Sequence, residues 1–224
     1  MTHFKLNEEH TITIPSGDVY LDGLLYIPKD ACGLVLFVHG SGSSRFSVRN
    51  QYVATVLNEA GLATLLFDLF TSDEDVIDNR TRQFRFDIGF LASRLIDATK
   101  WCLNQPTLQP LAIGYFGAST GGGAALVAAA KEPSIVRAVV SRGGRADLAG
   151  DDLAFVQAPT LLVVGGHDEV VIQLNSDAMV KLNCIKKMDV IPGATHLFEE
   201  PGTLNEVARI AKNWFVSYLG AATE

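Results

Sequence analysis

Short runs of apolar residues recur along this chain, and segments of mixed polarity separate them. In Gly33–Val38 and Leu62–Phe67 nearly every side chain is apolar, as in strands that are buried on both faces of a sheet. Later segments extend the same pattern. We expect the central strands to be Gly33–Val38, Leu62–Phe67, Leu111–Phe116, Ile135–Ser141, Thr160–Val164 and Lys186–Ile191.

Segments that suit helices lie between these strands. They are Val48–Ala60, Phe84–Leu103, Thr120–Lys131, Ile172–Leu182 and Leu204–Leu219. Such an alternation predicts an α/β protein with a mostly parallel sheet and helices on both of its faces. Because crossovers between parallel strands are right-handed, the strand-to-helix loops meet along one edge of the sheet, where ligands bind in these folds. Candidate chemistry is therefore expected at that edge.

The N-terminal part has a different pattern. Two segments, Glu9–Ile14 and Val19–Ile27, flank the turn-forming residues 15–18 and read as a pair of antiparallel strands. We find no repeat, low-complexity tract or linker. The chain has 224 residues, of which 48% are hydrophobic and 19% charged, which suits one α/β domain over residues 1–224.

Charge and composition narrow the function classes. A net charge of −7 disfavours a nucleic-acid partner. No apolar run reaches the length of a membrane span, and the first residues lack the apolar core of a signal peptide. The three cysteines, Cys32, Cys102 and Cys184, are odd in number and lack metal-type spacing. We therefore expect a cytoplasmic protein with reduced thiols, no metal, no cofactor and no membrane partner, as a monomer or weak homodimer.

The most specific motif is Gly117-Ala118-Ser119-Thr120-Gly121. An apolar strand enters it and an alanine-rich helix leaves it, which is the setting of a G-x-S-x-G nucleophile elbow. The glycines at both ends suit so sharp a turn because a side chain there would meet neighbouring backbone. The pentapeptide alone is weak evidence. With its strand and helix it predicts that Ser119 is a nucleophile.

Two further strand ends carry matching residues. Asp168 follows the strand Thr160–Val164, and His196 follows the strand Lys186–Ile191. The order Ser, Asp, His along the chain is that of this kind of hydrolase. His196 would act as the base and Asp168 would orient its imidazole. The alternative for Asp168 is a plain helix cap before Ile172–Leu182.

Residues 39–45, His-Gly-Ser-Gly-Ser-Ser-Arg, follow the strand Gly33–Val38. Taken alone, they suit a flexible turn. Beside an elbow, they suit the loop that supplies one N–H group to an oxyanion hole, with the other coming from Thr120. We expect His39 to be a structural residue at the strand end rather than a base.

These motifs resemble those of the α/β-hydrolase superfamily, and more closely its dienelactone-hydrolase-like branch. The resemblance covers nearly the whole chain through residues 39–43, 117–121, 166–168 and 193–196. It implies an eight-stranded, mostly parallel sheet without a large lid domain. It also implies Ser119 as nucleophile, His196 as base, Asp168 as acid, and Ser41 and Thr120 as the oxyanion-hole residues. Dienelactone hydrolases proper carry a cysteine nucleophile, so their substrate is not inherited.

Arginines gather in segments that are expected at the same edge. Arg45, Arg142 and Arg145 are candidates for binding a carboxylate or phosphate on the substrate. The alternative is that the arginines pair with local acids. Further arginines in this region are Arg49, Arg80, Arg82 and Arg85, and the acids near in sequence are Asp68, Asp73, Glu74, Asp75 and Asp78.

The long polar segment Thr71–Phe86 is expected to be a loop that overhangs the pocket. Several apolar side chains near it and near His196 are candidates for an acyl pocket, with core packing as the alternative for most of them. These are Phe70, Phe84, Phe86, Leu197 and Phe198.

Together these features predict a serine hydrolase that cleaves small carboxylic esters, thioesters or lactones through an acyl-enzyme on Ser119. One alternative is a ligand-binding or receptor-type protein on the same fold with slow turnover. Another is a peptidase on the same fold. A nucleotide-binding enzyme is disfavoured, because neither G-x-x-x-x-G-K-[ST] nor G-x-G-x-x-G follows a strand.

Overall fold

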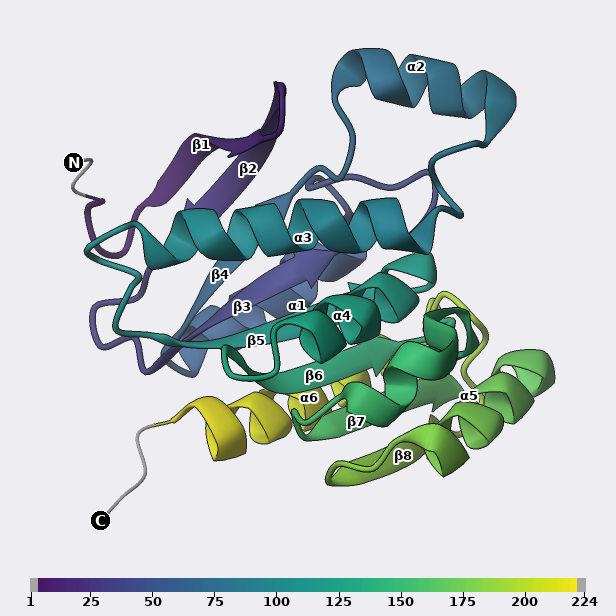
Figure 1. Ribbon diagram of the computed structural model, residues 1–224. Helices are drawn as coiled ribbons and strands as arrows, with labels where there is room; N and C mark the ends of the chain where they lie inside the picture. The colour runs from purple at the N-terminus through teal and green to yellow at the C-terminus, as the bar shows by residue number, and fades with distance from the viewer. Residues whose placement is uncertain (1–3, 221–224) are drawn as a thin grey trace.

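A computed structural model describes residues 4–220. Its strands form one eight-stranded sheet in the order β1-β2-β4-β3-β5-β6-β7-β8 (Figure 1). The pairings β1–β2 and β2–β4 are antiparallel and the others are parallel. The expected mostly parallel, eight-stranded sheet is therefore confirmed. Its strands are β1 (Glu9–Ser16), β2 (Val19–Tyr26), β3 (Gly33–Val38), β4 (Leu62–Phe67), β5 (Ala112–Ala118), β6 (Val136–Arg142), β7 (Thr160–Gly165) and β8 (Lys186–Ile191).

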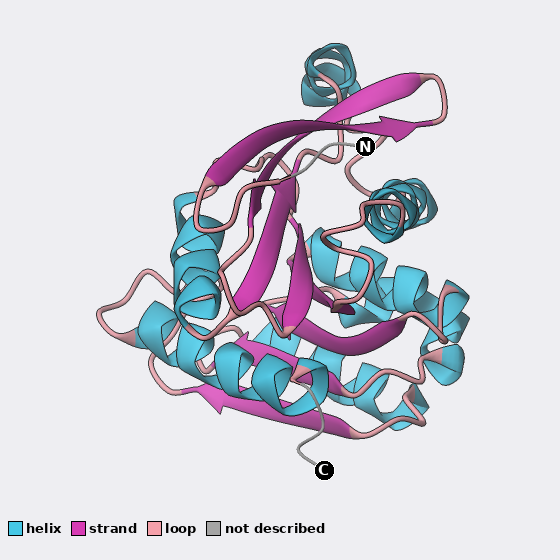
Figure 2. Cartoon of the chain, turned by 90° about the vertical axis from the view of Figure 1, so that its left-hand side faces the viewer, coloured by secondary structure: helices cyan, strands magenta, loops and turns pink. Residues whose placement is uncertain are grey.

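Helices cover both faces of the sheet (Figures 1 and 2). Every residue of β3, β4 and β7 is buried, which explains why these strands are apolar almost throughout. On β3, Val35 and Phe37 pack toward α1 and α6, whereas Leu34 and Leu36 belong to the core on the opposite face. The helices are α1 (Val48–Glu59), α2 (Ser72–Thr81), α3 (Ile88–Leu103), α4 (Thr120–Lys131), α5 (Glu169–Lys181) and α6 (Thr203–Leu219), with a 3₁₀ segment over Ala146–Phe155.

Helix α2 corrects the expectation of a loop over Thr71–Phe86. Its N-terminus is a capping box, in which the Thr71 hydroxyl accepts from the Glu74 N–H and the Glu74 carboxylate accepts from the Thr71 N–H. The helix stands apart from the layered body (Figure 1), so it shows no apolar face in the sequence. The next helix also starts later than expected, at Ile88, because the Asp87 side chain caps it by accepting from Phe90 N–H at 2.9 Å.

Two smaller findings complete the fold. All three cysteines are free thiols, with Cys102 buried and Cys32 and Cys184 half-buried. Within residues 4–220, no helix is both long and apolar enough to cross a membrane.

Candidate active site

Ser119 occupies the sharp turn between β5 and α4. Its φ of +51° and ψ of −123° lie in a region that non-glycine residues rarely adopt. Only glycine fits at the ends of the motif: a Cβ on Gly121 would collide with the Val38 carbonyl oxygen, and one on Gly117 would lie 2.6 Å from the Gly122 Cα. This backbone geometry is that of a nucleophile elbow.

His196 and Asp168 form a hydrogen-bonded pair at the same edge of the sheet. The distance between His196 Nδ1 and Asp168 Oδ2 is 2.6 Å. Asp168 is at the N-cap position of α5, but its side chain makes no capping hydrogen bond. Its carboxylate therefore serves the imidazole rather than the helix. Pairing through Nδ1 leaves the Nε2 atom of His196 available to exchange a proton with a hydroxyl group.

Strand β6 links this pair to the elbow. Gly143 follows β6 directly, and a Cβ at Gly143 would lie 3.6 Å from the His196 Cε1 atom. The preceding residue, Arg142, accepts a hydrogen bond from the Ser119 N–H through its carbonyl oxygen at 3.3 Å. The structure thus brings Ser119, Asp168 and His196 to one edge, as the chain order suggested.

The loop that carries His196 is braced by Glu200, a contact that the sequence did not indicate. The Glu200 carboxylate accepts from the Thr195 hydroxyl at 2.5 Å and from the Thr195 N–H at 3.1 Å. These hydrogen bonds from Thr195 lower the pKa of Glu200. An acid five residues after a loop threonine carries no distinctive signal, so only the folded loop reveals this brace.

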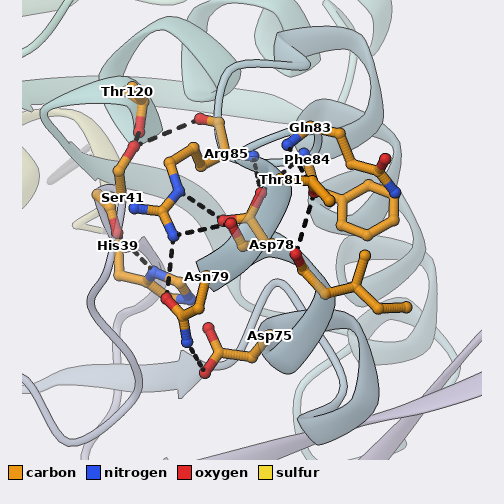
Figure 3. A network of polar contacts seen from close by, with 12 residues as sticks. His39, Ser41, Asp75, Asp78, Asn79, Thr81, Gln83, Phe84, Arg85 and Thr120 are labelled. Carbon is orange, nitrogen blue, oxygen red and sulfur yellow. Dashed lines mark hydrogen bonds and ion pairs between the residues drawn. The ribbon is translucent and has the colours of Figure 1, made fainter.

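The glycine-rich loop after β3 lies directly against the nucleophile. A Cβ on Gly40 would be 2.9 Å from the Ser119 Cβ, so glycine allows the close approach. The Ser41 hydroxyl lies 3.1 Å from the Thr120 hydroxyl (Figure 3). The two residues expected to form the oxyanion hole are therefore neighbours, although they are 79 positions apart in the chain.

His39 is buried at the start of this loop. Its Nε2 accepts from the Leu69 N–H at 3.0 Å, so its Nδ1 carries the proton and donates to the Gly40 carbonyl at 3.0 Å. Burial lowers the pKa of His39, which favours this neutral form. His39 thus ties the loop to the chain after β4, in line with a structural role.

The three candidate substrate-binding arginines have different surroundings. Arg45 pairs with Asp68 and lies 3.3 Å from Asp22. Arg145 makes two hydrogen bonds of 2.8 Å to the carboxylate of Asp147. Arg45 and Arg145 therefore pair with local acids, which was the alternative to substrate binding that the sequence left open.

Arg142 is buried and makes no ion pair within residues 4–220. Its Nη2 donates to Asn50 Oδ1 at 3.3 Å, whereas its Nε and Nη1 have no partner there. Its guanidinium carbon lies 6.0 Å from the centre of the Phe198 ring. Burial, and then the charge of Arg49, lower the pKa of Arg142 to about 10. This guanidinium is therefore a buried cation without a countercharge in the described chain.

Most of the apolar candidates for an acyl pocket belong to packed clusters. Phe198 is buried in the core, and the rings of Phe70 and Phe84 pack on Phe90 with centroids 6.2 and 5.4 Å away. Phe86 and Leu197 are exposed. Core packing therefore describes Phe198, whereas the exposed Phe86 and Leu197 and the half-buried Phe70, which lines a cavity, can meet a ligand.

A cavity of about 440 Å³ lies between the glycine-rich loop and α2. Its lining is rich in hydroxyl groups and includes Ser43, Ser44, Thr71 and Asn79. Ser119, Asp168 and His196 do not line it. The cavity therefore adjoins the expected oxyanion loop without including the three candidate catalytic residues in its lining.

Among known proteins, a dienelactone hydrolase from Anabaena variabilis has a solved structure similar to this chain. The two are 59% identical, the match covers 95% of this chain and 98% of that one, and the TM-score is 0.93. Est1E from Butyrivibrio proteoclasticus shares the fold at 19% identity, with 92% and 98% of the two chains covered and a TM-score of 0.77.

Curated relatives in two strains of Mycobacterium tuberculosis bear the name "Putative phosphoribosyl transferase". They are 56% identical to this chain over 211 residues, which is 94% of this chain and 47% of each relative. The chain thus spans about half the length of these relatives. Residues 21–221 match the model described as "Dienelactone hydrolase family". On this match and on the close similarity to the Anabaena protein, the chain belongs to the dienelactone hydrolase family of α/β-hydrolases.

Proposed function

We propose that this protein is a serine hydrolase that cleaves small carboxylic esters, thioesters or lactones through an acyl-enzyme on Ser119. The observation that carries the proposal is the 2.6 Å hydrogen bond between His196 and Asp168 at the edge where Ser119 occupies the elbow. A serine, a histidine and an aspartate in these roles activate a hydroxyl group for attack on a carbonyl carbon.

In the first half of the reaction, His196 Nε2 takes the Ser119 proton as the hydroxyl oxygen attacks the carbonyl carbon. Asp168 keeps the proton of His196 on Nδ1 and stabilises the imidazolium that forms. His196 then gives its proton to the leaving oxygen or sulfur, and the bond to the leaving group breaks. In the second half, a water molecule loses a proton to His196 and attacks the acyl-enzyme, which frees the acid and restores Ser119.

The developing oxyanion is assigned to the backbone N–H groups of Ser41 and Thr120. Loss of one such donor reduces the rate of a hydrolase by roughly 10²–10³-fold. Thr120 is the first residue of α4, a helix of 12 residues whose N-terminus faces the elbow. The partial positive charge at that helix end adds to the stabilisation of the oxyanion.

Acyl transfer is favoured over phosphoribosyl transfer for this chain. The relatives named for phosphoribosyl transfer extend over about twice the matched length. The family model and the 59% identical structure both bear the name of a hydrolase that acts on a lactone. The serine at position 119, in place of a cysteine, leaves the identity of the ester open to assay.

We also propose that Arg142, rather than Arg45 or Arg145, selects for esters that carry a negative charge. Arg45 and Arg145 already bind carboxylates, whereas the buried guanidinium of Arg142 makes no ion pair in residues 4–220. A buried charge is stabilised by an opposite charge. Arg142 also adjoins the elbow, because its carbonyl oxygen accepts the Ser119 N–H.

The direct test is hydrolysis of p-nitrophenyl esters from acetate to octanoate by the wild-type protein and by Ser119→Ala. We expect turnover in the wild type and its loss in the variant, with the chain-length profile giving the size of the acyl pocket. Folded wild-type protein that neither hydrolyses these esters nor reacts with a fluorophosphonate would leave ligand binding as the better account.

A further inference from the structure

Helix α2 has no buried apolar face, and two carboxylates hold it: Glu74, which pairs with Arg94 of α3 at 2.6 Å, and Asp78, which is buried. The only buried residue of this ten-residue helix is Asp78, whose side chain is 1% exposed. Asp78 Oδ1 accepts from the N–H groups of Phe84 and Arg85 at 2.8 and 3.0 Å. Asp78 Oδ2 accepts from Arg85 Nε at 2.6 Å (Figure 3). One carboxylate thus fixes the chain that follows the helix.

The Arg85 side chain makes two further hydrogen bonds to the C-terminal end of α2. Its Nη2 donates to the Asp78 carbonyl at 3.3 Å and to Asn79 Oδ1 at 3.0 Å, so its side chain spans the last turns of α2. The side chain of Arg85 is 16% exposed. With the guanidinium and the backbone N–H of Arg85 both bound to Asp78, the position of this residue is strongly restricted.

The carbonyl oxygen of Arg85 leads from this pair to the expected oxyanion hole. It lies 3.4 Å from the Ser41 hydroxyl, which in turn lies 3.1 Å from the Thr120 hydroxyl. A carbonyl can only accept, so Ser41 donates to Arg85 and its oxygen then accepts from Thr120. Hydrogen bonds on both sides of Arg85, with the backbone of Arg85 between them, therefore connect Asp78 to Thr120, the residue next to the nucleophile (Figure 3).

A hydrogen bond to the Arg85 carbonyl can hold Ser41 in the position that the oxyanion hole requires. Ser41 stands between two glycines; the Gly40 carbonyl accepts from the Ser43 N–H at 3.2 Å, but neither glycine offers a side chain that could hold Ser41 itself. An oxyanion hole stabilises charge only if its donors are already in position before the reaction. A contact from outside the loop can supply that order.

We propose that Asp78 and Arg85 are positioning residues that hold Ser41 against Thr120 and so keep the oxyanion hole ready for turnover. This inference rests on the proposed serine hydrolase function. Neither residue touches the reacting atoms, since both act through the Arg85 carbonyl oxygen and the Ser41 hydroxyl. Their loss is expected to reduce kcat and to leave KM for a small ester nearly unchanged.

A double-mutant cycle tests this chain of contacts. Asp78→Asn removes the charge that Arg85 binds, and Ser41→Ala removes the hydroxyl but keeps the backbone N–H. We expect each change to reduce kcat for p-nitrophenyl acetate by roughly tenfold, and the double variant to be about as slow as the slower single one, because both changes break one chain. A merely structural role for Asp78 predicts independent effects that multiply to roughly a hundredfold.

The matched control is Asp73→Asn, the same chemical change at an exposed position of the same helix. It is expected to keep the wild-type kcat. Thermal melts accompany each assay, and if Asp78→Asn does not melt cooperatively, the cycle is run with Arg85→Lys, which keeps the charge but loses the fork geometry.

The outcomes separate this inference from the function on which it rests. If the wild type hydrolyses the ester and Ser119→Ala does not, the proposed function stands. In that case, an unchanged kcat in Asp78→Asn, or effects of Asp78→Asn and Ser41→Ala on kcat that multiply in the double variant, overturns the positioning role alone. A wild type without hydrolysis overturns both. Active wild type, slowed single variants and no further loss in the double variant support the inference.

Discussion

At the scale of single residues, the backbone contacts of Ser119 explain how a serine is kept at positive φ. Its N–H donates to the Arg142 carbonyl at 3.3 Å, and its own carbonyl accepts from the N–H groups of Gly122 and Arg145, both at 2.9 Å. A non-glycine residue in such a region stores roughly 1–3 kcal/mol of strain, which these neighbours must offset. The elbow was predictable because its signal is local, with glycines at fixed positions around one serine.

The sequence pattern could not show which of the three candidate arginines is free to bind a substrate. The sequence placed Arg45, Arg142 and Arg145 at one edge of the sheet, but it gave no way to rank them. Which arginine is available to a substrate depends on which carboxylates the fold brings close to each guanidinium. Asp68 reaches Arg45 across 23 positions, whereas no carboxylate of the described chain reaches Arg142.

The role of Arg142 can be tested with Arg142→Met and a pair of esters. We expect KM for p-nitrophenyl hemisuccinate, which is anionic, to rise by roughly tenfold, because a hydrogen bond to a charged group contributes about 1.5–3 kcal/mol. KM for neutral p-nitrophenyl acetate should stay the same. Arg145→Met, which removes an arginine already paired with Asp147, serves as the control. An equal rise for both esters would remove Arg142 from substrate selection.

At the scale of elements, burial explains most of the bounds that were predicted correctly, and the edge strand β8, with one buried residue, is the exception. The bounds of β3, β4, β8 and α4 agree with those expected from the sequence. Strands β3 and β4 are buried throughout, and α4 is a nearly fully buried helix. Their runs of apolar residues therefore show in the sequence where each element packs in the core. Where an element packs against the core, its pattern is visible in the sequence.

Helix α2 has no such apolar pattern in the sequence. It buries one residue, a carboxylate, so hydrophobic periodicity gives no sign of it. The remaining signal was the capping box of Thr71 and Glu74, a short motif that competes with the many polar residues around it. Its long-range contacts through Asp78, Arg85 and Ser41 depend on the fold and could not be read from spacing.

The charge that holds α2 also predicts how stability varies with pH. Burial alone would raise the pKa of Asp78, but the backbone N–H groups of Arg85 and Phe84 and the Arg85 guanidinium outweigh it and lower that pKa. A lowered pKa in the folded state adds stability above the ordinary value near 3.8, and this stability is lost as the pH falls through the folded pKa.

Urea unfolding of the wild type and of Asp78→Asn between pH 7 and pH 3 measures this contribution. We expect the wild type to be more stable by roughly 3 kcal/mol at pH 7, as when one partner of a buried ion pair is removed. The gap should narrow as the pH falls below about 4. Two curves that stay parallel over the whole range would show that the Asp78 charge does not hold the helix.

At the scale of the whole molecule, the parallel topology assembles the site. Ser119 follows β5, Asp168 follows β7 and His196 follows β8, while Gly40 and Ser41 follow β3. The strand order brings these ends to one edge, so a mostly parallel sheet and the chain order Ser, Asp, His sufficed to predict the candidate triad. The contact of Glu200 with Thr195 within the His196 loop, and that of Arg85 with Ser41 between two loops, arise only once the loops are folded.

Peptide mass spectrometry can show whether Ser119 carries the acyl group. Wild-type protein and Ser119→Ala are mixed with p-nitrophenyl acetate, quenched in acid within the first turnover and digested. We predict an added acetyl group on the peptide that contains Ser119 in the wild type and no acetyl group on that peptide in the variant. An unmodified Ser119 in protein that is turning over the ester, or an acetyl group on another residue that persists in Ser119→Ala, would show that Ser119 is not the nucleophile.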